Sequence, residues 1–165
     1  MKKAYFKNTR ILAITPSTRG IGFAILEGNN KLLDWGVRGG KGDKNKVSIA
    51  HVKNLITRER PEVIVLQEMK GVRRAPRIKT LNRQIMAVVK SRKVNLEQLW
   101  DKQVKRKLLA EKEVTRHAIA EAVAKRFPNE LGLSLPPKRK PWKSEDPRID
   151  FFYAVALALT LKLKK

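Results

Sequence analysis

Cysteine is absent from this 165-residue chain, and histidine and acidic residues are scarce. Without cysteine, disulfides, Cys-based zinc sites and thiol catalysis are excluded. The two histidines, His51 and His117, lie far apart in the sequence, which argues against a His-rich metal site. Asp and Glu number 15 against 38 Lys and Arg, so the formal net charge is +23. A charge of this size repels itself in the compact state and favours a polyanionic partner.

Long hydrophobic runs are also missing. The N-terminal region has only four consecutive apolar residues, Ile11–Ile14, too few for the core of a signal peptide. The most apolar stretch, 151–161, is shorter than the ~20 residues that a membrane-spanning helix needs. The hydrophobic content of 42% is sufficient for a packed core. We therefore expect a single cytoplasmic domain over residues 1–165 with no membrane partner, and with a basic, proline-rich segment at 136–147 before the final helix.

The spacing of apolar residues predicts alternating strands and helices. Strands are expected at 11–15, 21–26, 31–37, 63–66 and 94–99, with a hairpin turn at 28–30. Helices are expected after the candidate N-cap Asp43 with Val47 and Ala50 inward, across 78–89, from the N-cap Thr115 to Phe127, and over about 148–161. Three strands followed by strand–helix alternation predict an α/β protein with a mixed sheet flanked by helices.

Positive charge is concentrated in two regions. Between Met69 and Lys107 there are 13 Lys or Arg and only two acids, and such a one-signed stretch favours contact with phosphates. The second region, 138–143, contains Trp142, which is either a stacking aromatic or a packed anchor for an extended segment. Charge alone does not separate DNA from RNA. The candidate nucleic-acid-binding residues are Arg19, Lys70, Arg73, Arg74, Arg77, Lys79, Arg83, Lys105, Arg106, Lys107, Lys138, Arg139, Lys140, Trp142 and Lys143.

Three segments together resemble RuvC-type Holliday junction resolvases of the RNase H-like superfamily. They are ILAITPSTRGIGFAIL at 11–26, VIVLQE at 63–68 and DFFYAVALALT at 150–160. The resemblance implies an RNase H-like fold with a five-stranded mixed sheet and helices on both faces. It also implies hydrolysis of phosphodiesters by two Mg²⁺ ions, which carboxylates from the first strand, the central strand and the last helix would hold.

The sequence departs from this pattern at each carboxylate position. Thr15, Gln67 and Tyr153 stand where the resemblance expects acids. A threonine hydroxyl is neutral and does not bridge two dications as a carboxylate does. The acids that survive nearby are Glu68, Asp146 and Asp150, and each has a second interpretation. Glu68 would pair with the arginines after it, Asp146 would cap the last helix before Pro147, and Asp150 would complement the positive end of that helix.

These observations favour a catalytically inactive protein on a RuvC-like scaffold that binds branched DNA or structured RNA, as in a ribonucleoprotein, and needs no cofactor. A homodimer is implied by the resemblance alone. One alternative is a Mg²⁺-dependent Holliday junction endonuclease with a site rearranged around Glu68, Asp146 and Asp150. A further alternative is a scaffold or assembly factor that binds an acidic protein.

Overall fold

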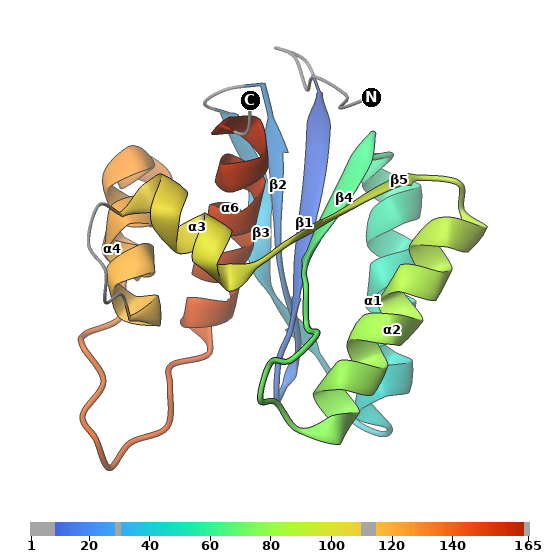
Figure 1. Cartoon of the computed structure of the whole chain (residues 1–165), viewed down its shortest axis with the longest axis horizontal. Coiled ribbons are helices and arrows are strands. Elements are labelled where there is room, and N and C mark those ends of the chain that lie inside the picture. The colour runs from blue at the N-terminus through green and yellow to red at the C-terminus, as the bar shows by residue number, and fades with distance from the viewer. Residues whose placement is uncertain (1–8, 29–30, 110–114, 164–165) are drawn as a thin grey trace.

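A five-stranded mixed sheet forms the centre of the molecule (Figure 1). The computed structural model describes residues 9–28, 31–109 and 115–163. The strand order is β3-β2-β1-β4-β5; β2 is antiparallel to β1 and β3, whereas β4 is parallel to β1 and β5. The strands are β1 (Arg10–Pro16), β2 (Gly20–Glu27), β3 (Lys31–Gly39), β4 (Val63–Gln67) and β5 (Asn95–Leu99). This arrangement confirms the fold class predicted from the sequence.

Helices cover both faces of the sheet (Figure 1). One layer consists of α1 (Lys44–Glu59) and α2 (Pro76–Ser91), and the other contains α3 (Asp101–Leu108), α4 (Arg116–Arg126) and α6 (Arg148–Leu163). Two short elements, α5 (Pro128–Leu131) and the 3-10 helix η1 (Gly132–Ser134), follow α4. None of these helices is both long and apolar enough to cross a membrane.

Local sequence signals account for where several helices begin. The Asp43 carboxylate accepts a hydrogen bond from the backbone N–H of Lys46 (3.0 Å), and the Thr115 hydroxyl accepts one from that of Ala118 (3.1 Å). Both contacts are those of an N-cap. Ala50, which we expected on the buried side of α1, is exposed, and the buried face of this helix instead includes Val52.

The predicted strands and the longer predicted helices agree with the structure within a few residues, but α3, α5 and η1 were not expected. The predicted turn at 28–30 falls partly on residues 29 and 30, which lie outside the described part of the chain. The helix α3 buries only Val104, so it lacks the apolar stripe by which helices are detected in a sequence.

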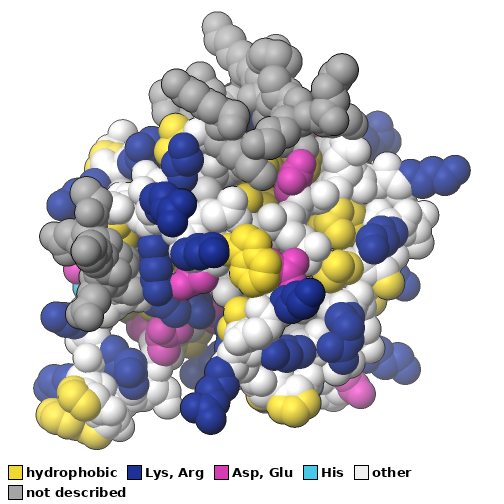
Figure 2. Space-filling view, in the orientation of Figure 1, with side chains coloured by type: hydrophobic (Ala, Val, Ile, Leu, Met, Phe, Trp, Pro, Cys, Tyr) yellow, Lys and Arg dark blue, Asp and Glu magenta, His cyan; other side chains and the backbone are white. Residues whose placement is uncertain are grey.

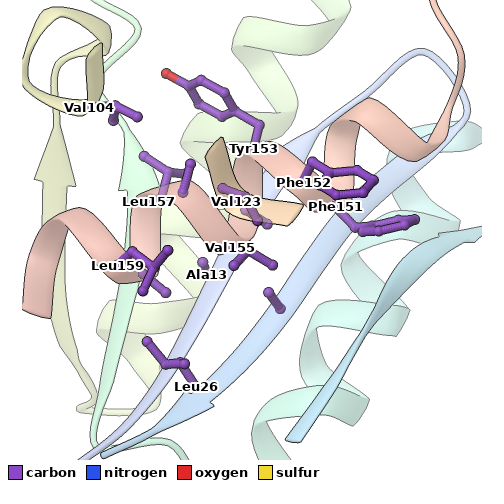
Figure 3. Packing of buried hydrophobic residues seen from close by; sticks show 14 of the residues in the cluster. Ala13, Leu26, Val104, Val123, Phe151, Phe152, Tyr153, Val155, Leu157 and Leu159 are labelled. Carbon is purple, nitrogen blue, oxygen red and sulfur yellow. The ribbon is translucent and has the colours of Figure 1, made fainter. Parts of the chain in front are cut away.

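The sheet separates two hydrophobic cores. Ile11 and Ala13 of β1 pack toward α6, whereas Leu12 and Ile14 pack toward α1 and α2. Figure 3 shows the α6 side, where Val155, Leu157 and other residues of α6 meet Ala13 and Leu26 from the sheet. The helix α6 therefore lies directly over β1 and β2, and its first turns lie near the carboxyl end of β1.

The central strand β4 is buried on both faces, and the structure decides which face each residue takes. Val63 and Val65 belong to the core on the α6 side, whereas Ile64 and Leu66 belong to the opposite core. Because side chains alternate along a strand, Gln67 lies on the α6 side. Gln67 is thus on the same side of the sheet as Thr15.

Candidate functional site

The three positions at which the resemblance expects carboxylates lie on one side of the sheet. Thr15 is near the carboxyl end of β1, Gln67 ends β4, and Tyr153 is in the first turns of α6; all three are buried. The structure therefore brings together the elements that would form a resolvase centre. What it places there are a hydroxyl, an amide and a phenol.

Thr15 uses its hydroxyl to hold the start of α6. Its Oγ1 donates a hydrogen bond to the backbone carbonyl of Asp150 at 2.9 Å. This close approach depends on Gly22, because a Cβ at that position would lie 2.6–2.8 Å from the nearest atoms of Asp150. The polar group of Thr15 is thus already committed to a protein contact.

Tyr153 is committed in a similar way. Its hydroxyl donates a hydrogen bond of 2.6 Å to Oδ1 of Asp101, the first residue of α3. In Figure 3 the phenol oxygen points away from the labelled core residues of α6. Burial and the hydrogen bond to Asp101 raise the pKa of Tyr153, so the phenol stays neutral and is not an anionic ligand.

The surviving acids have partners of their own. Asp150 accepts a hydrogen bond from Arg116 (3.1 Å); burial raises the pKa of Asp150 to about 6, although the Arg116 charge opposes this. Asp146 accepts bonds from the backbone N–H of Arg148 (2.9 Å) and from its guanidinium, which lowers the pKa of Asp146. Glu68 accepts a bond from the backbone N–H of Lys70 (3.1 Å).

These residues do not fit a two-magnesium centre. Mg²⁺ takes oxygen ligands in near-octahedral geometry, and a pair of ions needs several carboxylates to offset their repulsion. Over the ranges that the structure describes, no three Asp, Glu or His side chains lie close enough together to hold a metal ion. Asp150, which precedes Tyr153 by three residues on α6, pairs with Arg116 instead.

A cleft of about 440 Å³ opens beside these residues. In Figure 2 a hollow is visible in the lower part of the molecule, with acidic side chains near it and Lys and Arg around it. The turn between β1 and β2, the loop after β4, the start of α4 and the segment before α6 all contribute to its wall. The lining residues are Thr18, Arg19, Arg74, Arg116, Arg139, Ser144, Glu145, Asp146, Pro147 and Asp150.

Arg116 and Asp101 are the site residues that our sequence analysis missed. Arg116 follows the predicted N-cap Thr115, but nothing in its sequence context shows that its guanidinium lies 5.0 Å from the centroid of the Tyr153 ring. Asp101 lay in a region that we interpreted only by its charge. Both depend on how α3 and α4 pack against α6.

The predicted nucleic-acid-binding residues fall on several surfaces. Arg19, Arg74 and Arg139 line the cleft. Lys79 and Arg83 lie on α2, in the opposite helix layer. The other exposed members are Lys70, Arg73, Arg106, Lys107, Lys138, Lys140, Trp142 and Lys143.

Arg77 and Lys105 are among the predicted cations that make contacts within the protein. The Arg77 guanidinium donates to Asn45 Oδ1 (2.8 Å) and to the carbonyls of Ser17 and Thr18, so it fixes the turn that carries Arg19. Lys105 pairs with Asp101 at 2.8 Å within α3.

The tip of the 136–147 segment is an ordered turn. The backbone N–H of Lys143 donates to the carbonyl of Lys140 (3.0 Å), and Arg139 donates to the carbonyl of Lys143 (2.7 Å). Trp142 is 76% exposed, and the Lys140 ammonium lies 5.6 Å from the centroid of its ring. Trp142 is therefore not a packed anchor, and most of its side chain is accessible to solvent.

Comparison with known proteins identifies the fold. No family model and no curated protein matches the chain. A structure of Thermus thermophilus RuvC superposes with a TM-score of 0.64 and 20% identity over 92% of each chain. T. thermophilus RuvC in complex with a Holliday junction substrate gives 0.63 and 19% identity over 93% of this chain and 92% of RuvC. The fowlpox virus Holliday junction resolvase gives 0.52 and 13% identity over 94% of this chain and 99% of the resolvase.

The chain thus has the RNase H-like fold of RuvC resolvases. The likeness extends over nearly all of this chain and of those proteins, which agrees with the three resembling segments and their order in the sequence. At these identities it establishes the fold alone.

Proposed function

We propose that this protein binds branched nucleic acid, with a four-way DNA junction as the preferred ligand, and does not cleave it. The observation that carries the proposal is the replacement of the expected metal-binding carboxylates by Thr15, Gln67 and Tyr153 beside a cleft lined by arginines. One of the similar structures, T. thermophilus RuvC, is bound to a Holliday junction substrate, which supports a junction as the ligand for this shape.

The electrostatic balance also supports binding without hydrolysis. Cleavage by the two-metal route needs metal ions that activate a water molecule. In this protein, the arginines of the cleft supply the positive charge that would face a bound phosphate. A guanidinium has no water ligand to ionise. A net charge of +23 then gives attraction to any phosphodiester backbone, with the shape of the scaffold selecting branched forms.

The test combines binding and cleavage on labelled four-way junctions, with matched duplex DNA and an RNA hairpin as competitors. We expect tight junction binding in EDTA that Mg²⁺ and Mn²⁺ do not strengthen, because the protein itself supplies the cations. We expect no cleavage products in either metal. Light scattering of the same preparation measures whether the bound form is a homodimer, which we also propose by analogy with the two-fold symmetry of a junction.

Three results would contradict the proposal. Clean nicking that Asp150→Asn abolishes would establish the rearranged endonuclease. Preference for the RNA hairpin over the junction would make structured RNA the ligand. A purified protein free of nucleic acid after low-salt preparation, with no junction binding, would favour an acidic protein partner.

A further inference from the structure

The cleft contains two partly buried arginines that come from separate elements. Arg74 lies on the loop after β4, and Arg116 is the first residue of α4. Both line the cleft and interact electrostatically with each other and with Asp150. Two guanidinium groups are thus held near the carboxyl ends of β1 and β4, where the resolvase resemblance expects magnesium.

The hydrogen-bonding capacity of these arginines is mostly unused. Arg116 donates through one terminal nitrogen to Asp150, but its Nε is buried and has no hydrogen-bond acceptor in the described part of the chain. The Oε1 of Glu145, 3.5 Å from that Nε, makes only an ion-pair contact. No hydrogen bond, and no ion pair within 4 Å, joins Arg74 to any residue in the described ranges, although a guanidinium carries five N–H donors.

An arrangement of this kind is unfavourable without a ligand. Burial and the charge of Arg116 lower the pKa of Arg74, which shows that the surroundings disfavour its positive charge. Because the protein supplies no acceptor for Arg74 in the described ranges, its N–H groups can donate to solvent or to a ligand. An anion with several oxygens, placed between the two arginines, would relieve both the repulsion and the missing hydrogen bonds.

We propose that Arg74 and Arg116 together hold one phosphodiester group of the bound nucleic acid in this cleft, in place of the expected metal ions. This inference rests on the proposed function. The guanidinium N–H groups would donate to the two non-bridging oxygens of a single phosphate. No bond forms or breaks in this step, so the phosphate is held and not hydrolysed.

The acidic side chains in the cleft do not prevent this binding. Asp146 is engaged by the backbone and guanidinium of Arg148, and Glu145 is largely exposed to screening solvent. Asp150 lies nearest to the arginines and has a pKa of about 6. A phosphate beside Asp150 raises this pKa further, so Asp150 takes up a proton when the anion binds.

The experiment pairs a charge-removing variant with modified junctions. Arg74→Gln is compared with Lys53→Gln, which removes the same charge from an exposed position on α1, outside the predicted nucleic-acid-binding residues. The junctions carry a neutral methylphosphonate at one backbone position at a time around the branch point. For the wild type and Lys53→Gln we expect one or two positions at which the neutral linkage weakens binding by about tenfold or more, because charged hydrogen bonds are lost. For Arg74→Gln we expect the effect at those positions to fall below about threefold, because its partner is already missing.

Two results would contradict the proposed phosphate site. If the positional effect persists in Arg74→Gln as it does in Lys53→Gln, no phosphate is held by Arg74, and the proposed function stands without this site. If the wild type binds no junction at all, the proposed function and the site both fail. Circular dichroism and the thermal midpoint check that Arg74→Gln folds. If it does not fold, Arg74→Lys replaces it, keeping the charge and losing the two-pronged geometry, with a partial loss of the positional effect expected.

Discussion

At the scale of single residues, Asp150 is the most informative side chain in the protein. It is a carboxylate held among Arg116, Arg74 and Glu145, and its backbone carbonyl accepts the Thr15 hydroxyl. Burial outweighs the favourable arginine charges, so its pKa rises from 3.8 to about 6. The charged form of Asp150 is therefore less stable in the folded protein than in the unfolded chain.

This shift predicts a pH dependence of folding. Because the folded-state pKa lies above the unfolded one, the native state binds more protons between about pH 4 and pH 6, and stability falls as pH rises through that window. Asp150→Asn does not titrate there. Relative to the wild type it should gain up to roughly 3 kcal/mol in unfolding free energy between pH 4 and pH 7, measured by urea denaturation.

Asp146→Asn is the matched control for that measurement. Its hydrogen bonds to Arg148 lower the pKa of Asp146, so the charged carboxylate stabilises the fold. Asp146 titrates below about pH 4 in the folded protein, so the stability difference between Asp146→Asn and the wild type should stay nearly constant from pH 5 to pH 7, unlike that of Asp150→Asn. If the difference in unfolding free energy between Asp150→Asn and the wild type is constant from pH 4 to pH 7, burial does not raise the pKa of Asp150.

At the scale of elements, the segment 136–147 acts as a rigid projection and not as a loose tail. Its base is held where His117 Nε2 lies 2.8 Å from the carbonyl of Pro136, and its tip is closed by the bonds of Arg139 and Lys143. The prolines at 136, 137 and 141 further limit the backbone. The segment therefore presents Trp142 and the surrounding cations in a fixed arrangement beside the cleft.

We predict that Trp142→Ala weakens binding to a junction with unpaired bases at its centre by about 1–3 kcal/mol, the range for stacking of a base on an aromatic ring. Binding to uninterrupted duplex should change little, because its bases are already stacked. Trp142→Phe, which keeps a π-face, should recover much of the loss. Fluorescence anisotropy with the two DNAs measures both effects, and an equal loss on both would assign Trp142 to general affinity.

At the scale of the whole molecule, the excess of 38 basic over 15 acidic residues determines how strongly binding depends on salt. Lys and Arg are spread over the face shown in Figure 2. Lys79 and Arg83 lie on α2, in the helix layer across the sheet from α6. A ligand that wraps around the cleft and the projecting segment would cover many of these charges.

We predict that the logarithm of the junction binding constant falls with the logarithm of salt concentration with a slope of about −5 or steeper. Each phosphate that is neutralised contributes roughly −0.9 to this slope on duplex DNA, so six contacts suffice. Titrations between 50 and 300 mM salt measure it. A slope shallower than about −2 would mean that most of the positive charge does not contact the nucleic acid.

The sequence is most informative where pattern and burial coincide. The strands β1, β2 and β3 were predictable because their apolar runs are followed by proline or glycine, and β4 because its apolar run is continuous. The helices α2 and α6 were predictable because their buried residues form strong apolar patterns. The helix α3 was missed because Val104 is its one buried residue, and a stretch of lysines and arginines carries no periodic signal.

The sequence alone determined the class of fold, the excess of positive charge and the presence of Thr15, Gln67 and Tyr153 where the resemblance expects acids. Only the tertiary structure decided that Gln67 lies on the α6 side. Because β4 is apolar on both faces, its sequence pattern does not indicate which face each residue takes. The tertiary structure also decided that Arg116 meets Asp150 and Tyr153, because the direction of a residue at the start of a helix depends on how that helix packs. The candidate phosphate site is therefore a property of packing between elements far apart in the chain.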